Sequence, residues 1–160
     1  MPLRPGVRRL LNEARDAGLR LAIATTTSPE NVSVLLRQCL DPHAEAWFDV
    51  IAAGDIVPAK KPAPDIYQVA LQQLNLKPEE CLAFEDSENG LKSSFQAGIA
   101  TLVTVNDYTH GHDFSGANLV LDHLGEPDRS FKVLAGNAHG ATYVTVDLLR
   151  ALAREACTDA

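Results

Sequence analysis

The chain has 160 residues, of which 46% are hydrophobic and 22% are charged, and its formal net charge is −7. This length and composition are typical of one globular domain with a substantial core. The negative charge argues against a nucleic-acid partner and against an anionic membrane surface, because both need a basic field. There is no apolar stretch of membrane-spanning length and no signal-peptide pattern. Three widely separated cysteines predict a reducing compartment, so we expect a cytoplasmic protein.

The first part of the chain alternates between helical and strand patterns. Apolar residues spaced along one helix face predict a first helix that ends at Gly18. A short apolar run at residues 21–24 predicts a strand covered on both faces. Ser28 then caps a helix that runs to about Leu40, and residues 48–52 predict a second strand.

The same alternation continues to the end of the chain. We predict helices over residues 65–74, 87–97 and 146–155, and strands over residues 81–84, 101–105 and, from a weaker pattern, 119–121. Strands that alternate with helices, each strand a continuous apolar run, predict the α/β class. The expected architecture is a three-layer, Rossmann-like parallel sheet with helices on both faces. In such sheets the ligand crevice lies at the carboxyl ends of the strands.

Hydroxyl groups follow the first predicted strand. In A-I-A-T-T-T-S, Thr25 closes the strand directly before the Ser-Pro start of a helix. The free backbone N–H groups and the positive end of that helix form a ready anion site. The alternative is simple capping of the helix by hydroxyl groups, which needs no ligand.

A lysine lies in the loop after the second predicted strand. Lys61 precedes a proline in K-K-P-A-P-D, so its backbone is held extended and its side chain is directed. Its ammonium could neutralise a phosphate and balance nearby carboxylates. The alternative is a solvated lysine, which is the interpretation we favour for the neighbouring Lys60.

Two adjacent carboxylates end the third predicted strand, in F-E-D-S-E-N-G. At a separation of about 4 Å near the surface, Glu85 and Asp86 would repel each other by roughly 4 kcal/mol, so a cation is expected beside them. Hard oxygen ligands of this kind suit Mg²⁺. The alternative is a helix N-terminus whose acids favour its dipole, with Ser87 as the cap. Asn89 and Gly90 fit a close approach of the helix to a ligand nearly as well as a turn.

These groups all fall where strands end, so we expect them to form one constellation at a common edge of the sheet. The glycine-rich motifs of dinucleotide and P-loop nucleotide sites are absent from the sequence. The histidines of residues 110–113 could ligate a metal, but a polar surface loop is the favoured interpretation.

The order of the motifs resembles the haloacid dehalogenase superfamily, and within it the phosphoglucomutase-like branch. That family's second motif, a Ser or Thr that closes a strand, matches Thr25. Its third motif, the lysine of K-P-x-P-D, matches Lys61, and its fourth, an acidic pair at a strand end, matches Glu85 and Asp86. The segments A-T-T-T-S-P-E-N-V and K-K-P-A-P-D-I-Y look most like CbbY-type sugar-bisphosphate phosphatases.

The resemblance covers residues 3–122 and implies a single, partial core domain with residues 123–160 as a C-terminal extension. It implies a hydrolase, a Mg²⁺-dependent phosphatase, whose partner is a small phosphorylated sugar such as a xylulose bisphosphate-like pentulose. The family mechanism also requires a first motif, D-x-D-x-T, whose leading aspartate attacks phosphorus. No two aspartates in this chain are separated by a single residue. Without that nucleophile, covalent phosphoryl transfer has no starting group, so we expect the chain to be inactive alone.

The resemblance also implies that the strand before the first motif is central in the sheet, and that a cap domain follows it. Both are missing from the expected fold. Their absence would leave the strands that end at Ala24 and Phe84 without a shared neighbour, with buried backbone groups unpaired at about 1–3 kcal/mol each. We therefore expect those strands to pair directly, or a missing N-terminal segment or complementing chain to lie between them.

The leading hypothesis is that the chain is the C-terminal core of a Mg²⁺-dependent sugar-phosphate phosphatase. The residues assigned to its site are Thr25 and Lys61 as catalytic groups that, with Thr26 and Asn89, bind the substrate, and Asp86 with Glu85 for the metal. The alternative is a non-catalytic module that binds a sugar phosphate without chemistry. A phospho-acceptor receiver domain is disfavoured, because it expects the acidic pair before the Thr and the Lys.

Overall fold

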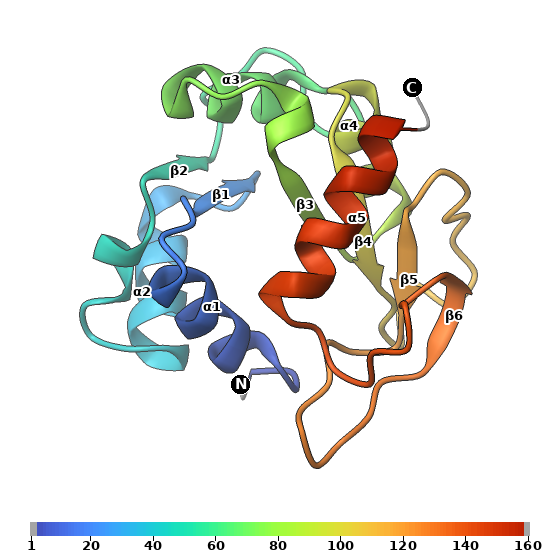
Figure 1. Ribbon diagram of the computed structural model, residues 1–160. Coiled ribbons are helices and arrows are strands. Elements are labelled where there is room, and N and C mark those ends of the chain that lie inside the picture. Colours follow the sequence, from blue (N-terminus) through green and yellow to red (C-terminus); the bar gives the residue numbers. More distant parts are fainter. Residues whose placement is uncertain (1–2, 159–160) are drawn as a thin grey trace.

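Helices and strands alternate along most of residues 3–158, the part of the chain that the computed structural model describes (Figure 1). The helices are α1 (Val7–Asp16), α2 (Pro29–Cys39), α3 (Asp65–Leu74), α4 (Glu88–Gln96) and α5 (Val146–Thr158), with short 3₁₀-helices η1 (Ala44–Trp47) and η2 (Pro78–Glu80). The strands are β1 (Ala22–Thr25), β2 (Val50–Ala53), β3 (Leu82–Glu85), β4 (Ala100–Thr104), β5 (Leu119–Leu121) and β6 (Val133–Gly136).

The strands form two separate sheets. Within the described residues, β1 pairs in parallel with β2, while β3, β4 and β5 form a parallel array that β6 extends in the antiparallel direction. The α/β class and the parallel direction of the first five strands are therefore as predicted. Of the two expected alternatives, direct pairing of β1 with β3 is not found in residues 3–158, where each of these strands is an edge of its own sheet. Figure 1 shows β1 and β2 on one side of the molecule and β3 to β6 on the other.

Helices cover both faces of the strands, and the alternation of side chains decides which helix each strand meets. On one face, α3 packs over both sheets, because its buried residues share one core cluster with Val50 and Ala52 of β2 and with Ala83 of β3. On the other face, Leu10 of α1 packs with Leu102 of β4 and with residues of β5 and α5. Two helices, α3 and α1, therefore connect the two halves of the molecule.

Two of the predicted helix starts have the expected caps. The Ser28 hydroxyl accepts a hydrogen bond from the Asn31 amide at 3.3 Å at the start of α2, and the Ser87 hydroxyl accepts one from the Gly90 amide at 3.1 Å at the start of α4. Because α2 follows β1 and α4 follows β3, both helix N-termini lie beside the carboxyl end of a strand. In the intervening loop, the Lys61–Pro62 peptide bond is cis.

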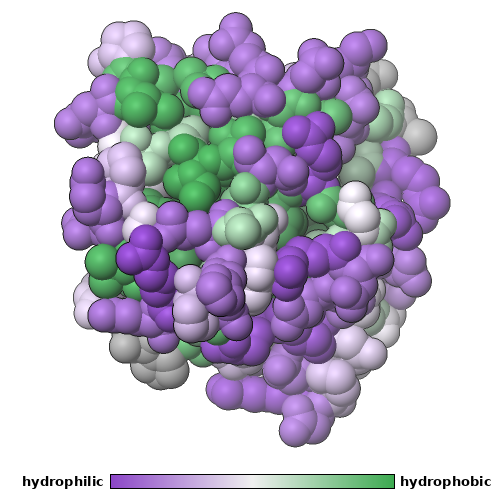
Figure 2. All heavy atoms as spheres, turned by 90° about the vertical axis from the view of Figure 1, so that its left-hand side faces the viewer, coloured by the Kyte–Doolittle hydropathy of each residue, from purple (hydrophilic) through white to green (hydrophobic). Residues whose placement is uncertain are grey.

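The sequence missed some elements in the loop-rich part of the chain. Residues 106–143 contain β6, a short V-L-A-G run in a loop-rich stretch that was not predicted as a strand, and all four of its residues are exposed. In the described part, no helix is both long and apolar enough to span a membrane. Figure 2 shows hydrophobic residues gathered on part of the face that lies at the left of Figure 1. Among the exposed hydrophobic side chains, Val34 and Leu35 of α2 are each about half exposed. The cytoplasmic location stays a prediction.

Candidate functional site

The Lys61 ammonium lies between the ends of two strands that do not pair with each other. Its Nζ donates to the Ala24 carbonyl of β1 at 3.2 Å and to Glu85 Oε1 of β3 at 2.6 Å. The lysine side chain is 18% exposed and that of Glu85 only 8%, so the ion pair is largely shielded from water. One ammonium therefore joins the carboxyl edges of both sheets, which is where parallel α/β proteins bind ligands.

Glu85 is held from three directions. Besides Lys61, the Tyr67 hydroxyl donates to the same Oε1 atom. On the opposite side the backbone of Gly90 is so close that a Cβ there would overlap Glu85 Oε2. Burial, and then the adjacent carboxylate charge of Glu85, raise the pKa of Tyr67 far above its usual value, so the phenol remains a neutral donor.

Asp86 faces a different environment from its neighbour. It is exposed, and its Oδ2 atom accepts a hydrogen bond from Asn106 Nδ2 at 3.4 Å. The two adjacent carboxylates therefore have separate partners: Glu85 turns inward to an ammonium and a phenol, and Asp86 remains at the surface. This separation explains how two like charges are accommodated side by side, because one of them is balanced inside the protein.

The remaining predicted site residues lie at the same edge without joining the Lys61–Glu85 pair. Thr25 directly follows Ala24, and its hydroxyl accepts a hydrogen bond from the Thr27 amide at 3.1 Å. Thr26 is exposed in the turn between β1 and α2, and Asn89 is exposed in the first turn of α4. The structure thus brings Lys61 and the acidic pair together, while the assigned roles of all these residues stay predictions.

No group of three or more His, Cys, Asp or Glu side chains within residues 3–158 is arranged to hold a metal ion. In the loop after β4, His112 Nδ1 accepts a hydrogen bond from the Glu88 amide at 3.1 Å, and Asp113 Oδ1 accepts one from the Ser115 amide at 2.9 Å. These contacts fit the surface-loop interpretation of residues 110–113.

Two residues at the site were not singled out in the sequence. Tyr67 is the last letter of K-K-P-A-P-D-I-Y and was predicted only as part of a helix. Asn106 follows β4, so the rule that parallel strand ends share an edge could have placed it near Asp86. No sequence signal gives the direction of the Tyr67 hydroxyl, which depends on how α3 packs.

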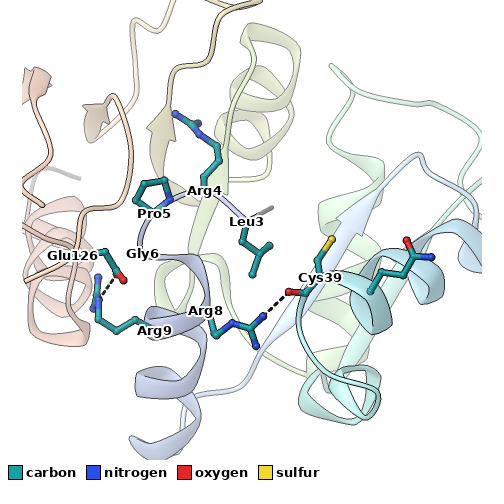
Figure 3. Close-up of a pocket in the computed structure, with 9 residues that line it drawn as sticks. Leu3, Arg4, Pro5, Gly6, Arg8, Arg9, Cys39 and Glu126 are labelled. Atoms are coloured by element: carbon teal, nitrogen blue, oxygen red, sulfur yellow. Dashed lines mark hydrogen bonds and ion pairs between the residues drawn. The ribbon is translucent and has the colours of Figure 1, made fainter. Parts of the chain in front are cut away.

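A pocket of about 440 Å³ lies elsewhere, at the start of α1 (Figure 3). Its lining includes three arginines, but each guanidinium already has acceptors in the protein. Arg8 donates to the Leu40 carbonyl at 2.6 Å, Arg9 donates to Glu126 Oε1 at 2.9 Å, and Arg4 donates to the Val105 carbonyl at 3.0 Å. This pocket contains none of the predicted site residues, so it is not a competing anion site.

Comparisons with known proteins agree with the α/β fold and define the family. Residues 1–98 match the family model described as haloacid dehalogenase-like hydrolase. Protein CbbY of Cereibacter sphaeroides is 50% identical over 124 residues, which are 78% of this chain and 54% of that protein. Crystal structures of CbbY from Rhodobacter sphaeroides, one with phosphate and one of a mutant with xylulose-(1,5)bisphosphate, are 50% identical with a TM-score of 0.74, covering 76% of this chain and 54% of theirs.

Some solved structures match nearly the whole chain. β-Phosphoglucomutase from Clostridium difficile covers 98% of this chain and 58% of its own, with a TM-score of 0.73 at 18% identity, which indicates a shared fold. The chain therefore belongs to the haloacid dehalogenase-like hydrolase family, and its similar proteins include CbbY and phosphoglucomutase-like proteins. It spans about half the length of the curated relatives it matches.

Proposed function

We propose that this chain is the phosphate- and metal-binding core of a phosphatase that acts on a small sugar bisphosphate, of the kind bound in the CbbY complex. The observation that carries the proposal is the position of the Lys61 ammonium, in contact with the end of β1 and with Glu85 at the end of β3. Residues 3–122 would form this core, with residues 123–160 as an extension. The similarity to CbbY supports a xylulose bisphosphate-like substrate.

The chain's own residues would bind and orient the phosphate. Lys61 would hold the phosphoryl oxygens by charge, because Glu85 and Ala24 already fix where its ammonium lies. The Thr25 hydroxyl and the Thr26 amide, next to the N-terminus of α2, would complete the anion site. Asn89, at the start of α4, would contact the rest of the substrate.

The acidic pair supports Mg²⁺ as the cofactor. Asp86 is exposed, with its Oδ2 atom bonded to Asn106, and Mg²⁺ usually takes only one or two carboxylates besides water and phosphate oxygens. Asp86 would bind the ion directly, with Glu85 beside it or connected through water. When bound, Mg²⁺ would neutralise charge on the phosphoryl group.

A complementing segment would supply what these residues lack. The sequence holds no D-x-D pair, so the attacking aspartate of the family mechanism would come from a segment outside these 160 residues. The unpaired edges of β1 and β3 support a place for an extended segment that pairs with both strands. We expect the isolated chain to bind phosphate but not to hydrolyse a generic aryl phosphate in the presence of Mg²⁺.

Binding of inorganic phosphate with and without MgCl₂, followed by NMR on the 160-residue chain, tests the proposal. Lys61→Ala should weaken phosphate binding at least about tenfold, because it removes a charge-assisted hydrogen bond. Lys60→Ala is the matched control: this exposed lysine pairs with Asp55 at 2.7 Å, and its loss should change affinity less than about twofold. Equal affinities of the two variants would contradict the proposal. Aryl phosphate turnover by the isolated chain that Lys61→Ala abolishes would contradict the expectation that the chain is inactive alone.

An experiment that adds the missing part distinguishes the phosphatase from the alternative, a binding module without chemistry. The part of CbbY from Cereibacter sphaeroides that this chain does not cover serves as the complementing segment. Release of phosphate from xylulose-1,5-bisphosphate by the mixture, and by neither part alone, would support the phosphatase. Saturable binding of the sugar phosphate without release, although the segment associates, would support the module.

A further inference from the structure

Tyr67 is the residue outside the predicted site that contacts it most closely. It lies in the first turn of α3, is only 9% exposed, and its hydroxyl donates to Glu85 Oε1. The same oxygen accepts from Lys61 Nζ at 2.6 Å, and that nitrogen lies 5.2 Å from the centre of the Tyr67 ring. One side chain thus contacts the carboxylate with its hydroxyl and the ammonium with its ring face.

These contacts restrict the Glu85 carboxylate to one position. Tyr67 and Lys61 bind its Oε1 atom, and the backbone of Gly90 closes the space beside Oε2. Without the phenol, the Oε1 atom of Glu85 would keep its hydrogen bond from Lys61 and lose the one from Tyr67. The ammonium and the carboxylate could then move together toward water. A flexible lysine placed in this way loses the directed geometry that phosphate binding needs.

We propose that Tyr67 is a positioning residue, whose hydroxyl fixes Glu85 and whose ring supports Lys61, so that the ammonium stays in contact with Ala24 and faces the phosphate site. The effect of Tyr67 on phosphate binding rests on the proposed function. The fixing of the ammonium itself depends only on the contacts of these residues.

Tyr67→Phe in the 160-residue chain tests the inference, because it removes the hydroxyl and keeps the ring. The first measurement is the hydrogen-exchange rate of the Lys61 ammonium by ¹H–¹⁵N NMR, with the signal assigned by its loss in Lys61→Ala. We expect exchange to rise about tenfold and the affinity for inorganic phosphate to fall about fivefold. Tyr143→Phe is the matched control, since that ring packs on Arg9, with its guanidinium carbon 4.9 Å from the ring centre, and should change neither value.

The outcomes separate this inference from the proposed function. An unchanged exchange rate in Tyr67→Phe overturns the role of Tyr67, as does faster exchange with unaltered phosphate affinity. Failure of the unmodified chain to bind phosphate overturns the proposed function instead, and the exchange rate still decides whether Tyr67 fixes the ammonium. Should Tyr67→Phe not fold, Gly90→Ala displaces Glu85 from the opposite side, and an unchanged Lys61 exchange rate there would overturn the fixed position of the carboxylate.

Discussion

The strands β4 and β5 differ from β1 and β3 in burial although all four are short apolar runs. Leu102 and Val103 of β4 and Leu119 and Leu121 of β5 are 0% exposed. In contrast, no residue of β1 is buried, and Phe84 of β3 is 42% exposed. The difference follows from their neighbours: β4 has a strand on each side, as does β5, whereas β1 and β3 each have a partner on one side within the described residues.

This comparison shows that the two halves of the molecule are stabilised differently. The half with β4 and β5 has an apolar core in which these strands are covered by α4 on one face and by α1 and α5 on the other. Where the halves meet, apolar packing comes from α3 and α1, and the strand edges themselves are linked at the rim by Lys61. Substitutions should therefore have large effects in the first region and smaller, more specific effects at the junction.

The largest effect is expected from a substitution within β4. Leu102→Ala should lower the free energy of unfolding by about 2–5 kcal/mol, because it leaves a cavity in a fully buried cluster. Phe84→Ala, in the edge strand β3, should lower the free energy of unfolding by only about 1 kcal/mol, although it removes more atoms. The reason is that the ring is already in contact with water. Urea unfolding of both variants checks the order, and equal costs would show that the edge of β3 is buried after all.

The apolar runs of residues 21–24 and 81–84 predicted strands correctly, but they could not reveal the division into two sheets. A continuous apolar run records that a strand packs on both faces, and it carries no information about which strand lies beside it. The helices were predicted well because their caps are local: Ser28 and Ser87 each bond an amide three residues away. The strand β6 was missed because its apolar run is only V-L-A-G within a loop-rich stretch, and the run does not reveal its antiparallel pairing with β5.

The candidate site, like the fold, could be predicted from the sequence only in part. The contact between Lys61 and Glu85 follows from the rule that parallel strand ends share an edge, together with the attraction between opposite charges. Which carboxylate of the pair turns inward could not be predicted, because both are acids at adjacent positions. That choice depends on Tyr67 and on the space beside Gly90, and so on the packing of α3 and α4.

A segment that pairs with β1 and β3 should remove the difference in burial between these two strands and β4 and β5. Addition of the part of CbbY that this chain does not cover, at about 100 times its dissociation constant, should stabilise the chain by about 2.7 kcal/mol, which raises the melting temperature by roughly 8 °C. Hydrogen–deuterium exchange should slow in β1 and β3. The exposed edge strand β6 is an internal control, and slower exchange there alone would contradict this placement.

Breaking the ion pair at the junction should have a smaller effect. Lys61→Met leaves the shielded Glu85 carboxylate with the Tyr67 hydroxyl but without a charge partner, and should cost about 2 kcal/mol, less than the loss of a fully buried pair because Lys61 is 18% exposed. The double variant Lys61→Met/Glu85→Gln should recover more than half of that cost in urea unfolding. No recovery would mean that the lysine stabilises the fold through its contact with Ala24 rather than through the charge of Glu85.

The smallest effect is expected at Arg9, which connects α1 to the other half of the molecule. Its guanidinium bonds Glu126 at 2.9 Å and the Gly125 carbonyl at 2.9 Å, both beyond β5, and also Glu13 of its own helix at 2.7 Å. Arg9→Ala should lower the free energy of unfolding by about 1 kcal/mol, since these charge-assisted bonds are only partly shielded.

Arg15→Ala is the control for Arg9, because Arg15 lies in the same helix with its guanidinium carbon 4.2 Å from the centre of the Trp47 ring, within the first half of the chain. Its loss should change the stability by less than about 0.5 kcal/mol. Arg9→Ala should also speed exchange at the α1–α5 contact, which Arg15→Ala should leave unchanged. If both arginines cost the same and neither alters that exchange, the bonds of Arg9 do not hold α1 to the second half. Its attachment there would then come from other contacts, which include the apolar packing of Val7 and Leu10 and the hydrogen bond from the Val146 amide to Glu13 Oε1 at 3.5 Å.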